Sequence, residues 1–178
     1  MTPERFSGGS KELDMILGGG LPACSTTILA GWPGTGKTVL AQQILFANAS
    51  DENRALYLTT LSEPLEKMVR HAQTLSYFNP DMLPGPVHYQ DIGQAIRRQG
   101  VGALPAIVEE ILTAHPATFL VIDSFKAFHD LSTDQVALRG ASSIWPVSSP
   151  RPASPPCCWV NTGPRTSTAF PSSPSPTA

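Results

Sequence analysis

The feature that most constrains the fold of this 178-residue chain is a glycine-rich segment near its N-terminus. Residues 31–38 read GWPGTGKT and match the pattern G-x-x-x-x-G-K-[ST] without a mismatch. An apolar, β-prone run at 26–30 precedes the segment, and residues 37–48 follow with helix formers whose apolar side chains recur at helical spacing. A strand, a glycine-rich turn and a helix in this order predict a phosphate-binding loop.

Each residue type in this loop has a chemical reason. Glycines let the backbone curl so that successive N–H groups face one phosphate, and the following helix presents its positive N-terminal end to the same anion. We expect Lys37 to reach the β- and γ-phosphates of a nucleotide and to act in catalysis, and the Thr38 hydroxyl to ligate Mg²⁺. A glycine-rich turn without a ligand is the alternative. The residues expected to bind the nucleotide here are Gly31, Pro33, Gly34, Thr35, Gly36, Lys37 and Thr38.

A second candidate lies at the end of the apolar run FLVI at 119–122, which is typical of a strand buried on both faces. Asp123 follows this run, and a carboxylate at the C-terminal end of a parallel strand points into the crevice where ligands bind. We therefore expect Asp123 to join Thr38 in binding Mg²⁺ and to form part of the nucleotide site. A solvated aspartate at a strand end is the alternative.

Hydrolysis of a nucleotide needs a group that orients or deprotonates water. Glu63 is the candidate because it follows the strand predicted at 55–60, on the sheet edge expected to hold the loop, and Glu66 is the substitute. An acidic residue in the first turn of a helix is also stabilised by the helix dipole alone. Both interpretations of Glu63 therefore stay open.

The rest of the pattern alternates strands with helices. Strands are predicted at 26–30, 55–60, 87–92 and 117–122, and helices at 37–48, 63–76 and 104–114. Strands that alternate with helices favour an α/β fold with a parallel sheet.

Composition divides the chain near residue 140. Nine of the 18 prolines and nine serines fall in residues 141–178, whereas residues 1–140 carry all 14 acidic residues and have a net charge of −4. The first part can bury a core, and the second is too rich in Pro and Ser to do so readily. We expect a domain over 1–140 and an irregular, disordered tail over 141–178.

Several locations and partners are disfavoured. No run reaches 18 apolar residues, so no membrane span is expected, and no charged-then-apolar leader opens the chain. Three cysteines without zinc-ligand spacing predict a reducing, cytoplasmic setting. The negative charge of residues 1–140 gives nucleic-acid binding no electrostatic support.

Residues 4–139 resemble a KaiC-like ATPase domain of the RecA superfamily. The resemblance is carried by ILGGGLP at 16–22, by the phosphate loop, by LYLTTLSEP at 56–64 and by VIDSFK at 121–126. It implies a three-layer RecA-like fold with a mostly parallel sheet, binding of ATP with Mg²⁺, and ATP hydrolysis. It also implies a homo-oligomer, since such domains often form hexameric rings, and members serve in clock, signalling, gas-vesicle and recombination roles.

The resemblance stops after Arg139, and the tail fits a shifted reading frame. Whatever synonymous codons are used, the neighbouring frame of CCWV at 157–160 encodes Leu-Leu-Gly, which resembles the family's next strand. In RecA-like sheets this strand lies between the phosphate-loop strand and the strand that ends in Asp123. We expect it to be absent, or replaced by PPCCWV at 155–160, where proline is poorly tolerated. The fold would then be incomplete. A genuine disordered tail is the alternative.

Loss of that strand is expected to separate Lys37 and Thr38 from Asp123 and to impair the ATPase. The expected function of the intact protein is ATP binding and hydrolysis in signalling or regulation. A nucleotide-binding regulatory module without turnover is one alternative. A Rad55-like recombination factor, which needs DNA affinity that falls with salt, is the other.

Overall fold

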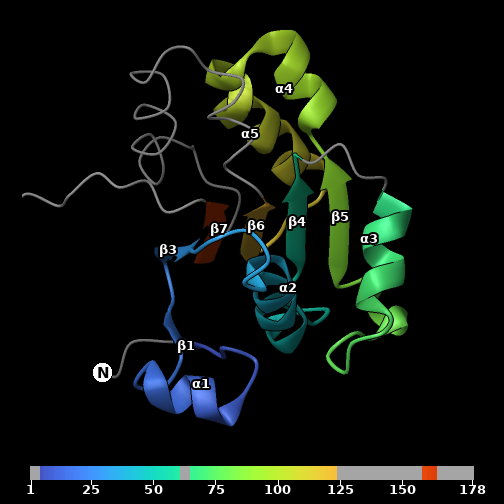
Figure 1. Ribbon diagram of the computed structural model, residues 1–178. Helices are drawn as coiled ribbons and strands as arrows, with labels where there is room; N and C mark the ends of the chain where they lie inside the picture. The colour runs from blue at the N-terminus through green and yellow to red at the C-terminus, as the bar shows by residue number, and fades with distance from the viewer. Residues whose placement is uncertain (1–4, 61–64, 124–157, 164–178) are drawn as a thin grey trace, which may run out of the picture.

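A parallel sheet of five strands forms the centre of the structure, with helices on both faces (Figure 1). The computed structural model describes residues 5–60, 65–123 and 158–163. The elements in chain order are β1 (Arg5–Phe6), α1 (Lys11–Ile16), β2 (Leu21–Pro22), β3 (Ser25–Ala30), α2 (Lys37–Asn48), β4 (Ala55–Thr59), α3 (Leu65–Ala72), η1 (Pro80–Met82), β5 (Val87–Asp91), α4 (Gly93–Gln99), η2 (Val101–Ala103), α5 (Leu104–Ala114), β6 (Phe119–Asp123) and β7 (Cys158–Gly163).

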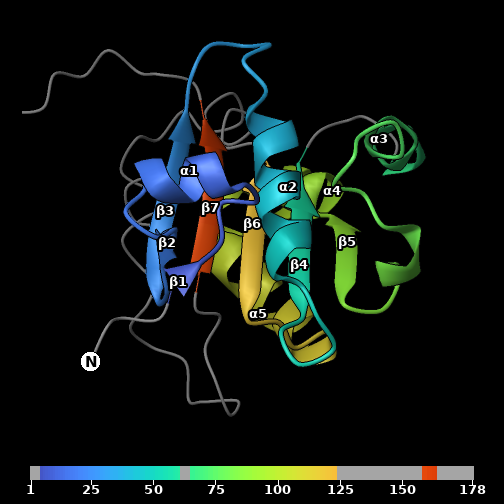
Figure 2. The ribbon, with the colours of Figure 1, turned by 90° about the horizontal axis from the view of Figure 1, so that it is seen from below.

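The strands lie in the order β3-β7-β6-β4-β5, and every neighbouring pair is parallel. Figure 2 shows this order across the sheet, with α2 in front of it and α4 and α5 behind. A separate antiparallel pair, β1 and β2, lies beside α1 near the N-terminus. The predicted α/β class with three layers is confirmed.

Two apolar cores hold the layers together, one on each face of the sheet. Every residue of β4 and β6 is buried, and because side chains alternate along a strand, each of these strands supplies both cores. The core under α2 includes Tyr57, Phe119 and Val121 with Ala41, Ile44 and Leu45. The core under α4 and α5 includes Leu56, Leu58, Leu120 and Ile122 with Ile96, Ile107 and Val108.

The segment ahead of β3 is tied to the C-terminal end of α2. Ser7 N–H donates to Asn48 Oδ1 at 2.8 Å, and Asn48 Nδ2 donates to the carbonyl oxygen of Ser7, also at 2.8 Å. Gly20 has φ +103°, and a Cβ at this position would lie 2.3 Å from the carbonyl oxygen of Phe6. Only glycine therefore allows the close approach of β1 and β2.

Most predicted elements are found within a few residues of the expected bounds. The helix predicted at 63–76 is α3 over Leu65–Ala72, while residues 63 and 64 lie outside the described residues. The strand predicted to reach residue 92 ends at Asp91, and the helix α4, which was not predicted, begins at Gly93. The Asp91 carboxylate accepts a hydrogen bond from the Gly93 N–H at 2.7 Å and so turns the chain from strand into helix.

The structure corrects the expectation for part of the tail. Cys158–Gly163 form β7, which pairs with β3 on one side and with β6 on the other. The expectation of an irregular tail is therefore wrong for these residues. The strand begins after Pro155 and Pro156, so no proline removes an N–H donor from the ladder. The remaining parts of the tail, 141–157 and 164–178, lie outside the described residues.

Candidate functional site

The predicted phosphate loop lies between the carboxyl end of β3 and the start of α2. Gly36 is the N-cap of α2, has φ +80°, and leaves the first turn of the helix without a side-chain hydrogen-bond acceptor. The first N–H groups of such a helix favour an anionic partner. An open groove of about 530 Å³ runs over the loop, between residues of β3 and Leu40 of α2. Its volume is within the ~300–1,000 Å³ of small-molecule sites.

Lys37 curls back over the loop. Its Nζ donates to the carbonyl oxygen of Trp32 at 2.9 Å and to that of Gly31 at 3.1 Å. Thr35 braces the same turn, because its Oγ1 donates to the carbonyl oxygen of Trp32 at 2.8 Å. An ammonium group held by neutral carbonyls can exchange them for phosphate oxygens, with which it makes stronger, charge-assisted hydrogen bonds.

Asp123 meets this loop at the edge of the sheet. Thr38 Oγ1 donates to Asp123 Oδ2 at 2.7 Å, and Asp123 is only 2% exposed. The expected separation of Thr38 from Asp123 is therefore wrong. β7 fills the space between β3 and β6 with backbone hydrogen bonds on both sides, and α2 carries Thr38 across it to the end of β6.

The paired oxygens of Thr38 and Asp123 have the chemistry that Mg²⁺ requires. This ion is held in proteins by one or two carboxylates together with phosphate oxygens rather than by a dedicated cage of side chains. The described residues contain no cluster of three or more His, Cys, Asp or Glu that could hold a metal ion. Bound here, Mg²⁺ would supply positive charge that neutralises the phosphate oxygens of a nucleotide.

Sequence reasoning missed Tyr57, which is fully buried on β4 and donates from its hydroxyl to Asp123 Oδ2 at 2.6 Å. Burial, and then the negative charge of Asp123, raise the pKa of Tyr57 well above its usual range, so the hydroxyl keeps its proton. A signal was available in the run ALYLTT. Tyr57 has the only hydroxyl-tipped aromatic side chain there, and a buried tyrosine hydroxyl needs a partner.

Two more tyrosines contribute to the core under α2 that includes Tyr57. The ring centroid of Tyr89 on β5 is 4.9 Å from that of Tyr57. The Tyr89 hydroxyl is buried and has no hydrogen-bond partner in the part of the chain that the structure describes. Tyr77 donates to Gln42 Oε1 on α2 at 2.7 Å, and burial raises the pKa of Tyr77 to about 12.

The candidate for water activation, Glu63, lies outside the described residues. Its substitute, Glu66, is exposed in the first turn of α3, where a carboxylate is stabilised by the helix dipole. The remaining predicted residues, Gly31, Pro33, Gly34, Thr35, Gly36, Lys37, Thr38 and Asp123, all lie at the carboxyl edge of the sheet.

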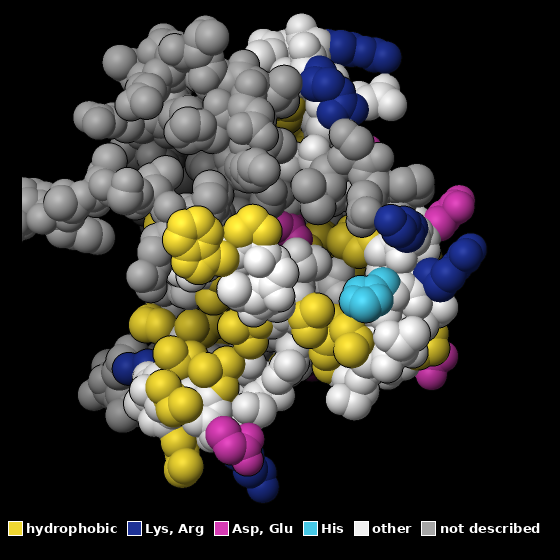
Figure 3. All heavy atoms as spheres, viewed as in Figure 1, with side chains coloured by type: hydrophobic (Ala, Val, Ile, Leu, Met, Phe, Trp, Pro, Cys, Tyr) yellow, Lys and Arg dark blue, Asp and Glu magenta, His cyan; other side chains and the backbone are white. Residues whose placement is uncertain are grey.

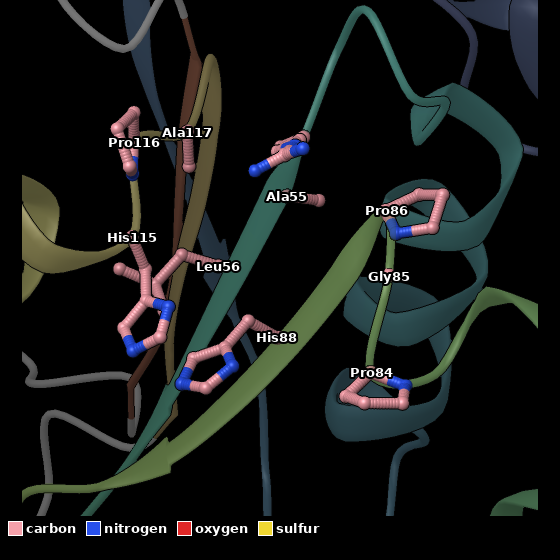
Figure 4. Close-up of a pocket in the computed structure, with 10 residues that line it drawn as sticks. Ala55, Leu56, Pro84, Gly85, Pro86, His88, His115, Pro116 and Ala117 are labelled. Atoms are coloured by element: carbon pink, nitrogen blue, oxygen red, sulfur yellow. The ribbon is translucent and has the colours of Figure 1, made fainter.

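A smaller cavity, of about 60 Å³, lies at the opposite, amino edge of β4, β5 and β6 (Figure 4). His88 and His115 stack beside it, with ring centroids 3.8 Å apart and planes 17° apart. Burial, and then the neighbouring His115, lower the pKa of His88. A nucleotide does not fit a space of this size, so the groove over the phosphate loop is the candidate ligand site.

Comparisons with known proteins agree with this geometry. The sequence model of one family, described as "ATPase: KaiC", matches residues 6–141. A UPF0273 protein of Methanopyrus kandleri is 35% identical over 66 residues, which are 37% of this chain and 26% of that protein. The DNA repair protein RadA of Mycolicibacterium smegmatis is 51% identical over 51 residues, which are 29% of this chain and 11% of that protein. The aligned segments thus span about a quarter or less of these relatives.

A crystal structure of a KaiC-like protein from Pyrococcus horikoshii OT3 shares the fold. The TM-score is 0.70 at 19% sequence identity, and the alignment covers 91% of this chain and 71% of that chain. Among the described residues, no helix is long and apolar enough to cross a membrane.

Proposed function

Because this chain belongs to the KaiC family of ATPases and forms a P-loop nucleotide-binding domain of the RecA type, we propose that it binds ATP with Mg²⁺ and hydrolyses the ATP to ADP and phosphate. The observation that carries the proposal is the hydrogen bond between Thr38 and Asp123, made beside the uncapped N-terminus of α2. It brings two oxygen ligands suited to Mg²⁺ to the place where backbone N–H groups favour a phosphate.

Each residue of the site has a role in this proposal. The backbone of Gly31, Pro33, Gly34, Thr35 and Gly36 shapes the loop around the phosphates. Lys37 contributes a positive charge and exchanges its present carbonyl partners for phosphate oxygens. Thr38 and Asp123 hold Mg²⁺. Glu63, which follows β4 in the sequence, orients the attacking water and accepts its proton, a role that a carboxylate can fill.

Three full-length proteins test the proposal by ATP binding and phosphate release: the wild type, Lys37→Ala and Glu63→Gln. Charge-assisted hydrogen bonds contribute about 1.5–3 kcal/mol, so Lys37→Ala should weaken ATP binding roughly 10- to 100-fold. The matched control is Lys11→Ala, which removes an exposed lysine on α1. Glu63→Gln should retain ATP binding and lose phosphate release. Equal ATP affinity in Lys37→Ala and the wild type would refute the assignment of the loop.

The same experiment separates hydrolysis from regulation by binding alone. If neither the wild type nor Glu63→Gln releases phosphate while both bind ATP, the chain is a nucleotide-binding regulatory module. Loss of release only in Glu63→Gln supports the ATPase. We place either activity in cytoplasmic signalling or regulation, in keeping with the expectation from the sequence.

We also propose that the chain forms a homo-oligomer. Apolar side chains gather on the side of the molecule that carries α1 and β3 (Figure 3), and the large exposed ones include Met15, Ile16, Ile28 and Trp32. Exposed apolar residues in such numbers mark interaction surfaces. Sedimentation of the full chain with and without ATP measures the assembly.

The match to RadA favours a second candidate, a role in DNA repair or recombination. DNA affinity that falls steeply with salt would support it. The charge of −4 over residues 1–140 makes DNA a poor electrostatic partner, so we place this role second.

A further inference from the structure

The Asp123 carboxylate is held from two directions. Thr38 Oγ1 reaches Oδ2 from α2 at 2.7 Å, and the Tyr57 hydroxyl reaches the same oxygen from β4 at 2.6 Å. The first donor lies in the first turn of α2, directly after the loop that is proposed to bind the nucleotide. The second belongs to the buried sheet and has no access to the groove, since Tyr57 is fully buried.

The direction of the Tyr57 bond follows from the two groups. The phenol O–H donates and the carboxylate oxygen accepts. Its ring has little freedom, because it is packed in the core under α2 and its centroid is 4.9 Å from that of Tyr89. A donor on a locked ring fixes the place of Oδ2, and thereby the direction in which the carboxylate faces.

We propose that Tyr57 is a positioning residue for Asp123, which it orients for the divalent cation that accompanies the nucleotide. This inference rests on the proposed function. The strand register supports it: Asp123 is the partner of Thr59 on β4, so Tyr57, two residues earlier, projects from the same face of the sheet. A tyrosine is long enough for its hydroxyl to reach the carboxylate along that face, whereas a phenylalanine has no hydroxyl to donate a hydrogen bond.

The test is the affinity of the full-length protein for Mg²⁺ in Tyr57→Phe. Groups that orient a metal ligand change metal affinity about 10- to 100-fold when they are removed. We expect a loss of about 10-fold, measured by titrating Mg²⁺ into protein that is saturated with a fluorescent ADP analogue. The affinity for the same analogue in EDTA should change less than about twofold, because the phosphate loop keeps its own contacts.

Tyr89→Phe is the matched control. It removes a neighbouring buried hydroxyl that has no hydrogen-bond partner in the described part of the chain, and it keeps the ring. Its Mg²⁺ affinity should equal that of the wild type. Mg²⁺ affinity that is unchanged in Tyr57→Phe, or equally reduced in both variants, overturns the proposal.

A double-mutant cycle shows whether Tyr57 acts through Asp123. In the Asp123→Asn background, Tyr57→Phe should cause no further loss of Mg²⁺ affinity, whereas a general disturbance of the fold would add to the first loss. Additive losses therefore overturn the proposal. A wild-type chain that binds no ADP analogue overturns the proposed function and this inference together, whereas normal Mg²⁺-dependent binding in Tyr57→Phe overturns the inference alone.

Discussion

Val160 in the middle of β7 offers the sharpest test of the sheet. It pairs with Thr27 of β3 on one side and with Val121 of β6 on the other. A Val160→Pro substitution removes the backbone N–H and with it one hydrogen bond between β7 and a neighbouring strand. The partner carbonyl on the neighbouring strand then stays buried without its donor.

The size of the effect follows from the loss of this donor. Removing one partner of a backbone hydrogen bond, so that the buried other partner is left unsatisfied, costs about 1–3 kcal/mol. This is a substantial part of the ~5–15 kcal/mol that stabilises a typical domain. At this chain length each kcal/mol lowers Tm by about 2–4 °C, so Val160→Pro should lower it by roughly 2–12 °C.

The assay is thermal unfolding of full-length Val160→Pro against Val160→Ala, followed by circular dichroism. The alanine variant loses the same side chain but keeps the N–H, so the difference in Tm between the two isolates the backbone. ADP binding by Val160→Pro should weaken as well, since β7 connects the strand of the phosphate loop to the strand of Asp123. Equal Tm values for the two variants would show that β7 is not a central strand.

Two further substitutions address other parts of the fold. The pKa of His88 is lowered in the folded protein, so its neutral form stabilises the fold above a pH of about 6.5, and this contribution is lost as the pH falls through the lowered pKa. The free energy of unfolding, measured in urea from pH 8 to 5, should therefore depend less steeply on pH in His88→Gln than in the wild type. The control His71→Gln, which replaces an exposed histidine on α3, should show no such change. Gly20→Ala should lower the free energy of unfolding in urea by at least ~2 kcal/mol, since the new Cβ would meet the Phe6 carbonyl oxygen. Gly18 has φ +66° and open space around it, so Gly18→Ala should lower the same free energy by only about 1–2 kcal/mol. Equal losses in the two variants would contradict the close approach at Gly20.

The elements that the sequence predicted well are those with a strong local signal. The helix predicted at 37–48 is α2, because apolar spacing and the glycines before it act within one segment. The short helices α1 and α4 escaped prediction. Each has only six or seven residues, and each starts from a single side chain: Ser10, which accepts a hydrogen bond from Leu13 N–H, and Asp91, which accepts one from Gly93.

The candidate site was predictable where chemistry follows from spacing and was missed where it follows from packing. Lys37 and Thr38 belong to one local pattern, and Asp123 follows from the end of a buried strand. Tyr57 reads as a core residue until β4 and β6 are placed side by side, since only their register brings its hydroxyl to Asp123. The prediction for residues 158–163 was wrong because it relied on the composition of the whole tail. That composition predicts no core, but a central strand needs only a short extended backbone between two neighbouring strands. The division at residue 140 and the shifted frame stay predictions.

The place of β7 in the sheet also determines when β3 finds a strand partner during synthesis. β3 is the first described strand of the large sheet to be made, and its one neighbour among the described strands is β7, the last of them in the chain. A chain emerging from the ribosome thus carries β3 without a described strand partner in the large sheet until β7 has been translated. The pairing of Thr27 with Val160 is a contact between distant parts of the chain, which is slow to form. Nucleotide, which stabilises only the state that it binds, can therefore favour the sheet in which β7 is already paired with β3 and β6.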